Sequence, residues 1–413
     1  MLAADPATAA ITCDVLVVGA GPAGTAAAIE LQRGGRHVVV VDKAVFPRDK
    51  CCGDGLTTLA LRELEHLGLD PATVAGWRDV SSAWLRSPSG REVELPLPTD
   101  GKFAAVAPRQ DLDDALVRLA RAEGVDIRDG CTFAGLSPET SDALDLTIDG
   151  LGTVRAHYVI AADGMWSPVR KALGVNQRGY LGEWHAFRQY VGDVTGPAAD
   201  RLYVWFEGDL LPGYAWSFPL PGNRANVGFG VLREQSRRTG DMKDLWTDIL
   251  RRPHIVAALG PGFVLEDRHT AWPIPARIDE VTLSHGRTLF VGDAAAATDV
   301  MTGEGIGQAL LTGRLAAEAI LAAGTHDPSK ARAAYESAVR NHLFADHTMS
   351  RVLGKVLRRP LGARGAIRVV GASGQWGRRN FARWMFEDEP RAVMLTPRRW
   401  HRRFLARPGA YRR

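Results

Sequence analysis

Three glycines and one aspartate near the start of the chain have the spacing of an adenine-dinucleotide site. Gly19, Gly21 and Gly24 form G-x-G-x-x-G, and Asp42 follows them. The first glycine of such a loop permits a tight turn, the second lets a pyrophosphate approach the backbone, and the third lets a helix pack close to a strand. A carboxylate about 20 residues further on can accept the ribose hydroxyls of an adenosine. These residues predict a nucleotide whose pyrophosphate is bound at a helix N-terminus.

The elements around this motif are expected to form a complete strand–helix–strand unit. Asp14–Val18 is a short apolar run typical of a buried parallel strand. A helix is expected to open near Ala23 and to end at Gly34 and Gly35. His37–Val41 is the expected second strand, and the acid of the motif stands directly after it.

Two later strands also end in an aspartate. The apolar strand in residues 153–174 ends at Asp163, and Arg287–Val291 is followed by Asp293. Ligands bind at the carboxyl edge of open α/β sheets, so both carboxylates are expected at the same edge as the glycine motif. The glycines from Gly303 to Gly307 precede a helix and offer further amide donors. Both aspartates could instead be turn residues without a ligand, but three motifs in this order disfavour that alternative.

The remaining segments predict a loop, short strands and, in residues 184–275, a second, antiparallel domain. Residues 46–57 contain one proline and two glycines, which is typical of a loop, and residues 78–98 and 131–157 alternate like strands. Residues 184–275 are rich in aromatic residues, proline and glycine, with short alternating runs and one helical insert at Met242–Leu250.

The three motifs in order, GAGPAG, AADG and FVGDAA…GEGIGQAL, resemble an FAD-dependent oxidoreductase of the glutathione-reductase-type Rossmann superfamily, in the branch with p-hydroxybenzoate hydroxylase. The resemblance implies that Asp293 binds the ribityl chain of FAD and that loop amides lie near the isoalloxazine. The chain has Asp42 where a glutamate is more usual, which we expect to affect the ribose contact only slightly. The cofactor-binding residues that it implies are Gly19, Gly21, Gly24, Asp42, Arg109, Asp163, Asp293, Gly303, Gly305 and Ile306.

Two further motifs resemble the geranylgeranyl reductase family. PRDKCCGDGL, residues 47–56, is similar to that family's P-x-x-K-x-C-G-x-G loop, and PGYAWSFPL, residues 212–220, is similar to its Y-x-W-x-F-P substrate motif. The resemblance implies reduction of isoprenoid carbon–carbon double bonds. The chain length and the run PGYAW…NVGFGVL resemble actinobacterial members, including menaquinone reductases. A polyprenyl lipid or a menaquinone is therefore the expected substrate.

This chemistry requires an apolar tunnel with an acid beside the flavin. An isolated alkene has no carbonyl to polarise, so a proton must reach one carbon as hydride from reduced FAD reaches the other. Tyr214, Trp216 and Phe218 are spaced i, i+2, i+4 and share one strand face, where they could bind a polyprenyl chain and stabilise developing positive charge. The residues alone, without the resemblance, would favour an ordinary sheet core. Tyr214 and Cys52 are the predicted catalytic residues.

Cys52 lies in a polar loop beside Lys50 and Gly53, and all three are expected near the cofactor. Its thiol could have a lowered pKa or act as a redox or proton-donating group, and a purely structural role is an equal alternative. Cys51 is a weaker candidate. The cysteine spacing fits neither a disulfide framework nor a zinc site, and no metal is expected.

The charge is unevenly distributed along the chain. Residues 351–413 contain 17 Arg or Lys and three acids, a net charge of +14, whereas the rest has 34 basic and 44 acidic residues, a net charge of −10. Aromatic residues stand among these arginines, a pattern that favours a membrane interface over a solvated helical face. Nucleic acid is not an expected partner, because no nucleic-acid-binding fold accompanies the charge. No signal peptide or run of about 18 apolar residues is expected, and residues 1–12 resemble a disordered leader. We expect a cytoplasmic protein, peripheral on the inner face of the cell membrane.

The predicted fold is α/β, with a Rossmann-type, glutathione-reductase-like FAD-binding domain, an inserted antiparallel-sheet substrate domain and a helical C-terminal region. A flavin monooxygenase and a non-catalytic flavin-binding sensor or interaction protein are the alternatives. The electron donor, NAD(P)H or a ferredoxin-type protein, stays open. The predicted boundaries are 12–76, 105–178 and 277–325 for the FAD-binding domain, 77–104 and 179–276 for the substrate domain, and 326–413 for the basic helical region.

Overall fold

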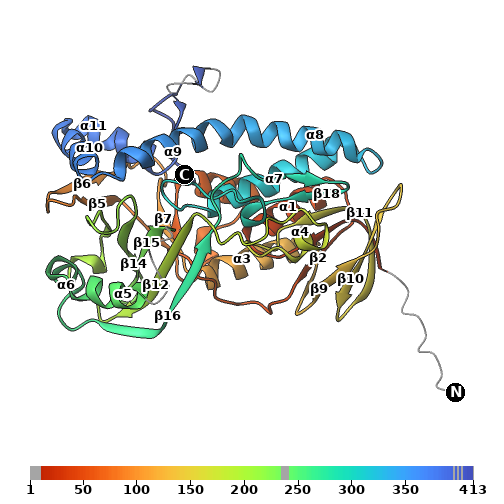
Figure 1. Ribbon diagram of the computed structural model, residues 1–413, viewed down its shortest axis with the longest axis horizontal. Coiled ribbons are helices and arrows are strands. Elements are labelled where there is room, and N and C mark those ends of the chain that lie inside the picture. The colour runs from red at the N-terminus through yellow and green to blue at the C-terminus, as the bar shows by residue number, and fades with distance from the viewer. Residues whose placement is uncertain (1–10, 234–240, 394–395, 398–399, 401–402, 413) are drawn as a thin grey trace.

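The computed structural model describes residues 11–233, 241–393, 396–397, 400 and 403–412, and its α/β architecture confirms the predicted fold class (Figure 1). Most of the expected leader, residues 1–12, lies outside the described residues. The prediction is wrong for Ile11 and Thr12, which extend the first strand because they pair with Val154 and Arg155.

The first sheet is a twisted, mainly parallel sheet of eight strands. Its central strands are apolar at nearly every position, as expected where helices cover both faces, and Val38–Val41 are fully buried. All neighbours in the main order are parallel except β17 and β18, and β10 and β9 continue antiparallel from β11. The main order is β17 (Ser284–His285), β18 (Thr288–Phe290), β11 (Gly152–Ala161), β1 (Ile11–Val18), β2 (Val38–Asp42) and β8 (Asp126–Asp129), followed off this order by β10 (Leu144–Asp149) and β9 (Thr132–Leu136).

Two of the helices of this part of the protein pack against each other with their backbones very close together. The backbone of α1 meets α7 so closely that a Cβ on Gly313 would lie 2.1 Å from the carbonyl oxygen of Ala23. Among the described helices, α7 alone has the length and mean hydropathy, 1.2, of a membrane-crossing segment, but 67% of that segment is buried inside the protein. It is therefore a core helix. The helices of this part are α1 (Pro22–Arg33), α2 (Thr58–Leu67), α3 (Arg109–Ala122), α4 (Pro168–Ala172) and α7 (Ile306–Ala323), and the 3₁₀ turn η3 (Gly292–Ala295) precedes α7.

The second sheet has seven strands and its own aromatic core. Phe229 stacks on both Phe187 and Trp246, and the tryptophan comes from helix α5. Neighbouring strands are antiparallel except β13 and β5. Their order is β16 (Val264–Ile274), β12 (Trp184–Gly192), β15 (Arg224–Leu232), β14 (Tyr214–Leu220), β13 (Leu202–Trp205), β5 (Ser82–Arg86) and β6 (Glu92–Pro96), with α5 (Asp241–Arg251) and α6 (Pro253–Leu259) beside them and a small sheet of β3 (Gly55–Leu56), β7 (Ala105–Val106) and β4 (Arg78–Asp79) nearby.

The C-terminal region joins the two sheets. Helices α8 and α9 continue one another through a π-helical turn at Arg340–Phe344 and run along one side of the molecule, from the first sheet towards the second (Figure 1). Helices α10 and α11 then pack on β6 at the edge of the second sheet. The predicted helical C-terminal region is thus confirmed for its described part. The helices are α8 (Pro328–Val339), α9 (Ala345–Leu357), α10 (Pro360–Ala372) and α11 (Gly374–Met385).

Candidate active site

One cavity of about 1060 Å³ brings the sequence motifs together. It begins at the carboxyl edge of the first sheet, passes the loop of residues 47–56, and ends between the second sheet and helices α9–α11. Gly24 is the one predicted site residue that does not line it. The predicted residues that do are Gly19, Gly21, Asp42, Lys50, Cys52, Gly53, Arg109, Asp163, Tyr214, Trp216, Phe218, Asp293, Gly303, Gly305 and Ile306.

The three glycines of the first motif have different surroundings. Gly19 has a φ of +108°, and a Cβ there would lie 2.3 Å from the carbonyl oxygen of Ala162. A Cβ on Gly24 would lie 1.8 Å from the carbonyl oxygen of Gly19, so this glycine serves helix packing. A Cβ on Gly21 would meet only Arg48 Nη2, at 3.8 Å, and would otherwise enter the cavity. This open cradle at the start of α1 fits a pyrophosphate.

Asp42 is held at the edge of the cavity by backbone donors. Its Oδ2 accepts a hydrogen bond from the amide of Ala20 at 2.7 Å, and its Oδ1 accepts one from the amide of Ala44 at 2.8 Å. Each carboxylate oxygen has a second lone pair for a ribose hydroxyl. The geometry therefore fits the predicted adenosine contact.

Two arginines near the cradle share one buried carboxylate. The guanidinium of Arg109 donates to both oxygens of Asp113 at 2.8 and 2.7 Å, and Arg48 Nη1 donates to the same carboxylate at 2.7 Å. Burial alone would raise the pKa of Asp113, but these two guanidinium groups lower it overall. Arg48, two residues before Lys50, is a candidate phosphate contact that the sequence analysis missed, although its place beside the cysteine loop was a signal.

The two aspartates after the strands also face the cavity. Asp163 Oδ2 accepts the amide of Val169 at 2.9 Å, whereas its Oδ1 is buried without a partner among the described residues. Burial raises the pKa of Asp163 to about 6. Asp293, in η3, pairs with Lys50 Nζ at 3.2 Å, and the ammonium lies 5.2 Å from the ring centre of Trp272. A polar atom of the cofactor could donate a hydrogen bond to Asp163 Oδ1 and satisfy this buried acceptor.

Two of the predicted amide donors in the glycine loop already donate hydrogen bonds to other groups of the protein. The amide of Gly303 donates to the carbonyl of Asp299 at 2.9 Å, and the amide of Ile306 donates to Glu304 Oε1 at 3.0 Å. Glu304 Oε1 also accepts the amide of Gly307, because α7 begins at Ile306 and its first amides need acceptors. The prediction that the Gly303 and Ile306 amides are available to a flavin is therefore wrong. The glutamate, which the sequence analysis passed over, caps this helix.

The aromatic residues of β14 form one wall of the cavity, as their spacing predicts. The ring centres of Tyr214 and Trp216 lie 6.0 Å apart, and those of Trp216 and Phe218 lie 6.1 Å apart. The cysteine loop packs directly on this wall, since a Cβ on Gly55 would lie 2.9 Å from the Phe218 ring. The hydroxyl of Tyr214 donates to the carbonyl of Thr302. This hydrogen bond connects the aromatic wall to the glycine loop that precedes α7.

Cys52 is a neutral thiol in this environment. Burial raises its pKa to about 11, so the prediction of a lowered pKa is wrong; burial also raises the pKa of Cys51. Asn226 in β15 fixes the loop by donating to the carbonyl of Cys52 at 2.8 Å and to Asp54 Oδ2 at 2.7 Å. Tyr190 donates to the same carboxylate, whose pKa burial raises to about 6.

The far end of the cavity is apolar and lies against the C-terminal helices. No role was predicted for these residues from the sequence, although the spacing of Ala363, Ala366, Ile367 and Val370 indicates one apolar helix face. Side chains of the second sheet stand opposite them. The lining residues from both sides are Leu353, Val356, Leu357, Ala363, Ala366, Ile367, Val370, Phe381, Trp384, Met385 and Phe386 from the C-terminal region, and Leu85, Leu202, Val204 and Phe206 from the sheet.

Comparison with known proteins gives a consistent result. Residues 12–338 match the FAD-binding domain family. The chain is 34% identical over 372 residues to the menaquinone reductase of Mycolicibacterium smegmatis, covering 84% of this chain and 85% of that protein. It is 32% identical over 321 residues to digeranylgeranylglycerophospholipid reductase 1 of Methanococcoides burtonii, covering 74% and 75%.

A solved structure shares the fold. The crystal structure of a geranylgeranyl bacteriochlorophyll reductase-like protein from Thermoplasma acidophilum superposes with a TM-score of 0.78 at 23% identity, covering 94% of this chain and all of that one. The motifs, the cavity and these relatives together give the family. The chain belongs to the FAD-binding domain family and is an FAD-dependent oxidoreductase of the geranylgeranyl reductase group.

Proposed function

We propose that this protein reduces a carbon–carbon double bond in an isoprenoid chain, with the polyprenyl tail of a menaquinone as the favoured substrate. The observation that carries the proposal is the continuous cavity, which has a nucleotide cradle at one end and a long apolar section at the other. A linear hydrocarbon chain fits that section because the described residues that line its two walls are apolar.

When bound, reduced FAD supplies the hydride. The chain's own residues bind and orient the substrate and exclude water from it. The aromatic wall of β14 and the apolar faces of α10 and α11 enclose the alkene, and the ring of Trp216 can stabilise positive charge that develops on carbon. Asp42, Arg48 and Asp163 are the groups that would hold the polar parts of the cofactor.

The names of the relatives support the choice of substrate. One relative is named for menaquinone and another for a digeranylgeranyl glycerophospholipid, and both compounds carry isoprenoid chains. We favour menaquinone because the relative named for it covers more of this chain.

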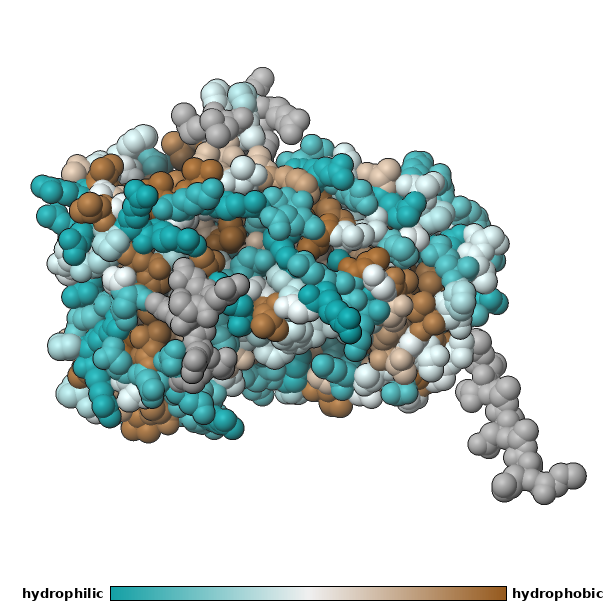
Figure 2. Space-filling model, in the orientation of Figure 1, coloured by the Kyte–Doolittle hydropathy of each residue, from teal (hydrophilic) through white to brown (hydrophobic). Residues whose placement is uncertain are grey.

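We also propose that the protein is cytoplasmic and binds the inner face of the cell membrane through α9–α11. Large apolar side chains are exposed on these helices, and hydrophobic and hydrophilic residues alternate over this part of the surface (Figure 2). Arginine and lysine residues on the same helices can contact anionic headgroups. The exposed apolar residues are Val352, Val356, Leu361, Val369 and Trp376, and the exposed basic residues are Lys355, Arg358, Arg359, Arg364, Arg368 and Arg379.

Mass spectrometry tests the proposed reaction. The purified flavoprotein is reduced under nitrogen and mixed in detergent with menaquinone or with a geranylgeranyl lipid. A gain of two hydrogens in the menaquinone tail supports the proposal. A gain on the geranylgeranyl lipid alone would keep the reaction but make that lipid, rather than menaquinone, the substrate. A gain of oxygen on admission of air would replace the reductase with the alternative monooxygenase.

A matched pair of variants tests the role of the apolar section. Val370 is buried and lines the cavity, so Val370→Phe should narrow it and lower turnover at least about tenfold, because overfilling a packed site forces side chains out of place. Val264→Phe adds the same ring at an exposed position of β16 and should leave turnover unchanged. Equal turnover in both variants, at equal FAD content, would contradict a substrate path beside α10.

A further inference from the structure

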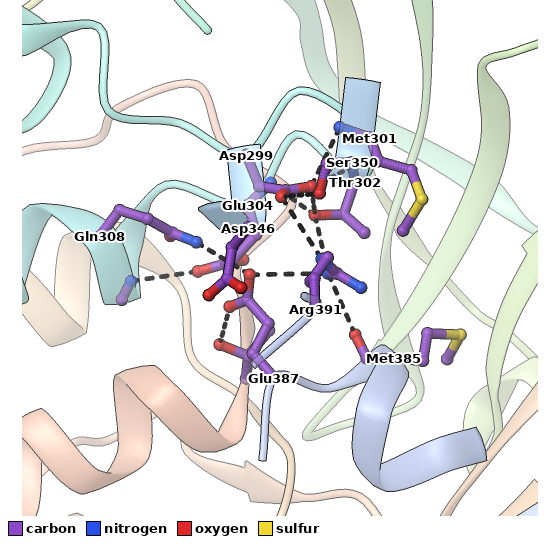
Figure 3. A network of polar contacts seen from close by, with 12 residues as sticks. Asp299, Met301, Thr302, Glu304, Gln308, Asp346, Ser350, Met385, Glu387 and Arg391 are labelled. Carbon is purple, nitrogen blue, oxygen red and sulfur yellow. Dashed lines mark hydrogen bonds and ion pairs between the residues drawn. The ribbon is translucent and has the colours of Figure 1, made fainter. Parts of the chain in front are cut away.

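Carboxyl groups from distant parts of the chain gather at the start of α7. Asp299 and Glu304 come from the loop before this helix, and Glu387 comes from the segment after α11. Asp299 and Glu387 lie beside the guanidinium of Arg391, and Glu304 is bound by backbone amides in the same cluster (Figure 3). The side chains of Arg391 and Glu387 are only 2% and 9% exposed, so water screens their charges weakly.

Asp299 is satisfied as a carboxylate. Its Oδ1 accepts the amides of Met301 and Thr302 at 3.0 and 2.8 Å, and its Oδ2 accepts the hydroxyl of Ser350 at 2.7 Å. Arg391 Nε lies 3.3 Å from the same Oδ2. Burial alone would raise the pKa of Asp299, but Arg391 and these donors lower it overall. The charge of Arg391 is therefore largely balanced by Asp299.

Glu304 and Glu387 are left with mostly neutral donors. Backbone amides bind Glu304, while Gln308 Nε2 and the hydroxyl of Thr57 donate to the two oxygens of Glu387 at 2.8 and 2.9 Å. Arg391 Nη2 is 3.6 Å from Glu387. Asp346 adds another negative charge near Arg391. One guanidinium cannot neutralise this many carboxylates away from bulk water, so the pair of glutamates retains a proton at neutral pH.

The ionisable neighbours of Glu304 act in the same direction. Burial, and then the charges of Glu387 and Asp299, raise the pKa of Glu304. Burial also raises the pKa of Glu387, and this effect outweighs the opposing charge of Arg391. Cys52 and Tyr214 face Glu304 from the cysteine loop and β14, and both have raised pKa values themselves. Neither of them supplies positive charge to the glutamate.

Glu304 is also in the right place. It lines the cavity between Gly303 and Gly305, in the loop predicted to lie beside the flavin, while Glu387 stands behind it and does not line the cavity. Gln308 Oε1 is buried without a partner among the described residues, and it is an acceptor that a carboxylic acid O–H could satisfy.

We propose that Glu304 is the acid that protonates the substrate alkene, and that Glu387 is a positioning residue that shares this proton before it is transferred. This inference rests on the proposed reductase function. The hydride supplied by reduced FAD forms a C–H bond at one alkene carbon, and the π electrons form the second C–H bond with the proton of Glu304. The O–H bond of Glu304 breaks and leaves a carboxylate, and the two electrons of the hydride leave FAD oxidised.

Glu304 is a better donor than the two predicted catalytic residues. The thiol of Cys52, with a pKa of about 11, is a weaker acid. Tyr214 has a raised pKa, and its proton is engaged by the carbonyl of Thr302. A carboxylic acid kept neutral near pH 7 by its surroundings combines availability with acid strength.

Infrared spectroscopy of the FAD-loaded protein, without substrate, tests the acid directly. Wild-type protein should show a protonated-carboxyl band at pH 7 that shifts in D2O and disappears at alkaline pH. Glu304→Gln should lose that band, and Glu387→Gln should lose it at lower pH because a neighbouring negative charge is gone. Glu318→Gln, at an exposed residue paired with Arg314, is the control and should match wild type. A band that Glu304→Gln leaves intact would overturn the assignment.

Turnover then separates this inference from the proposed function. Glu304→Gln should reduce alkene reduction by about 10²- to 10⁴-fold while FAD content and chemical reduction of the flavin stay at wild-type values. If the wild-type protein reduces an isoprenoid and Glu304→Gln does so at the same rate, the acid role is refuted while the proposed function stands. Failure of the wild-type protein to reduce any isoprenoid would refute the proposed function, and the acid role with it.

Discussion

Two alanine substitutions in the first motif should have opposite consequences. Gly21 has a φ of −74°, which alanine adopts readily, and its added Cβ would enter the cavity. Gly21→Ala should therefore fold as wild type, or up to about 1 kcal/mol more stably, because alanine restricts the unfolded chain. Gly24→Ala would gain about 1 kcal/mol in helix propensity, but its Cβ would stand 1.8 Å from a backbone oxygen of Gly19. Overpacking against backbone costs about 1–3 kcal/mol or more, so this variant should be less stable.

For FAD binding, by contrast, Gly21→Ala should be the more damaging of the two substitutions. A methyl group at Gly21 needs about 3.5–4 Å from a phosphate oxygen, which prevents the roughly 2.9 Å contact of that oxygen with a backbone amide. One lost charge-assisted hydrogen bond is worth about 1.5–3 kcal/mol, so the Kd for FAD should rise roughly 10- to 150-fold. Flavin fluorescence titration and thermal unfolding of the same preparations measure both effects. Wild-type FAD affinity in a folded Gly21→Ala protein would refute a pyrophosphate at this turn, and wild-type stability of Gly24→Ala would refute the close packing of α1 on β1.

Two further predictions concern a buried acid and the surface of the C-terminal helices. Asp54 is fully buried, and burial raises the pKa of its carboxyl in the folded protein to about 6. Protonation of Asp54 should therefore stabilise the fold fully below about pH 4, and this stabilisation should be lost as the pH rises through 6. Relative to Asp54→Asn, the wild-type free energy of unfolding should fall by about 2 kcal/mol between pH 4 and pH 7 in urea titrations, and a constant difference would contradict the raised pKa. Replacing Leu361 and Val369, 80% and 70% exposed, with glutamate should weaken flotation with anionic vesicles at least about tenfold. Val264→Glu, on β16, is the matched control, and equal binding of both proteins would place the membrane contact elsewhere.

The parts of the fold predicted from sequence are those that local rules determine. The strand, glycine turn and helix of residues 11–33 need only an apolar run, three glycines and a Gly stop. The second strand, expected at His37–Val41, is likewise found at Val38–Asp42, because four consecutive valines favour a buried strand. The domain boundaries, by contrast, remain a prediction.

The errors arose where distant residues determine the environment. Cys52 stands beside Lys50 in sequence, which suggested a lowered pKa, but burial against strands of the second sheet dominates and raises it. The Ile306 amide is engaged by Glu304, two residues away, so this error was avoidable: a glutamate just before a helix is an ordinary capping acceptor. The apolar face of α10 was visible as a spacing, but its partner, β6, could not be identified without the tertiary fold.

The C-terminal region connects the proposed membrane contact to the proposed acid. Val356 is 52% exposed and also lines the cavity, so the apolar surface of α9 continues into the tunnel. Glu387 and Arg391, from the same region, complete the carboxyl cluster at the other end. Exposing one five-carbon isoprene unit to water would cost about 4 kcal/mol, at about 0.8 kcal/mol for each carbon group. A continuous apolar route from the proposed membrane contact to Glu304 would avoid that cost for every unit of the chain, and the C-terminal region would then form both ends of the path.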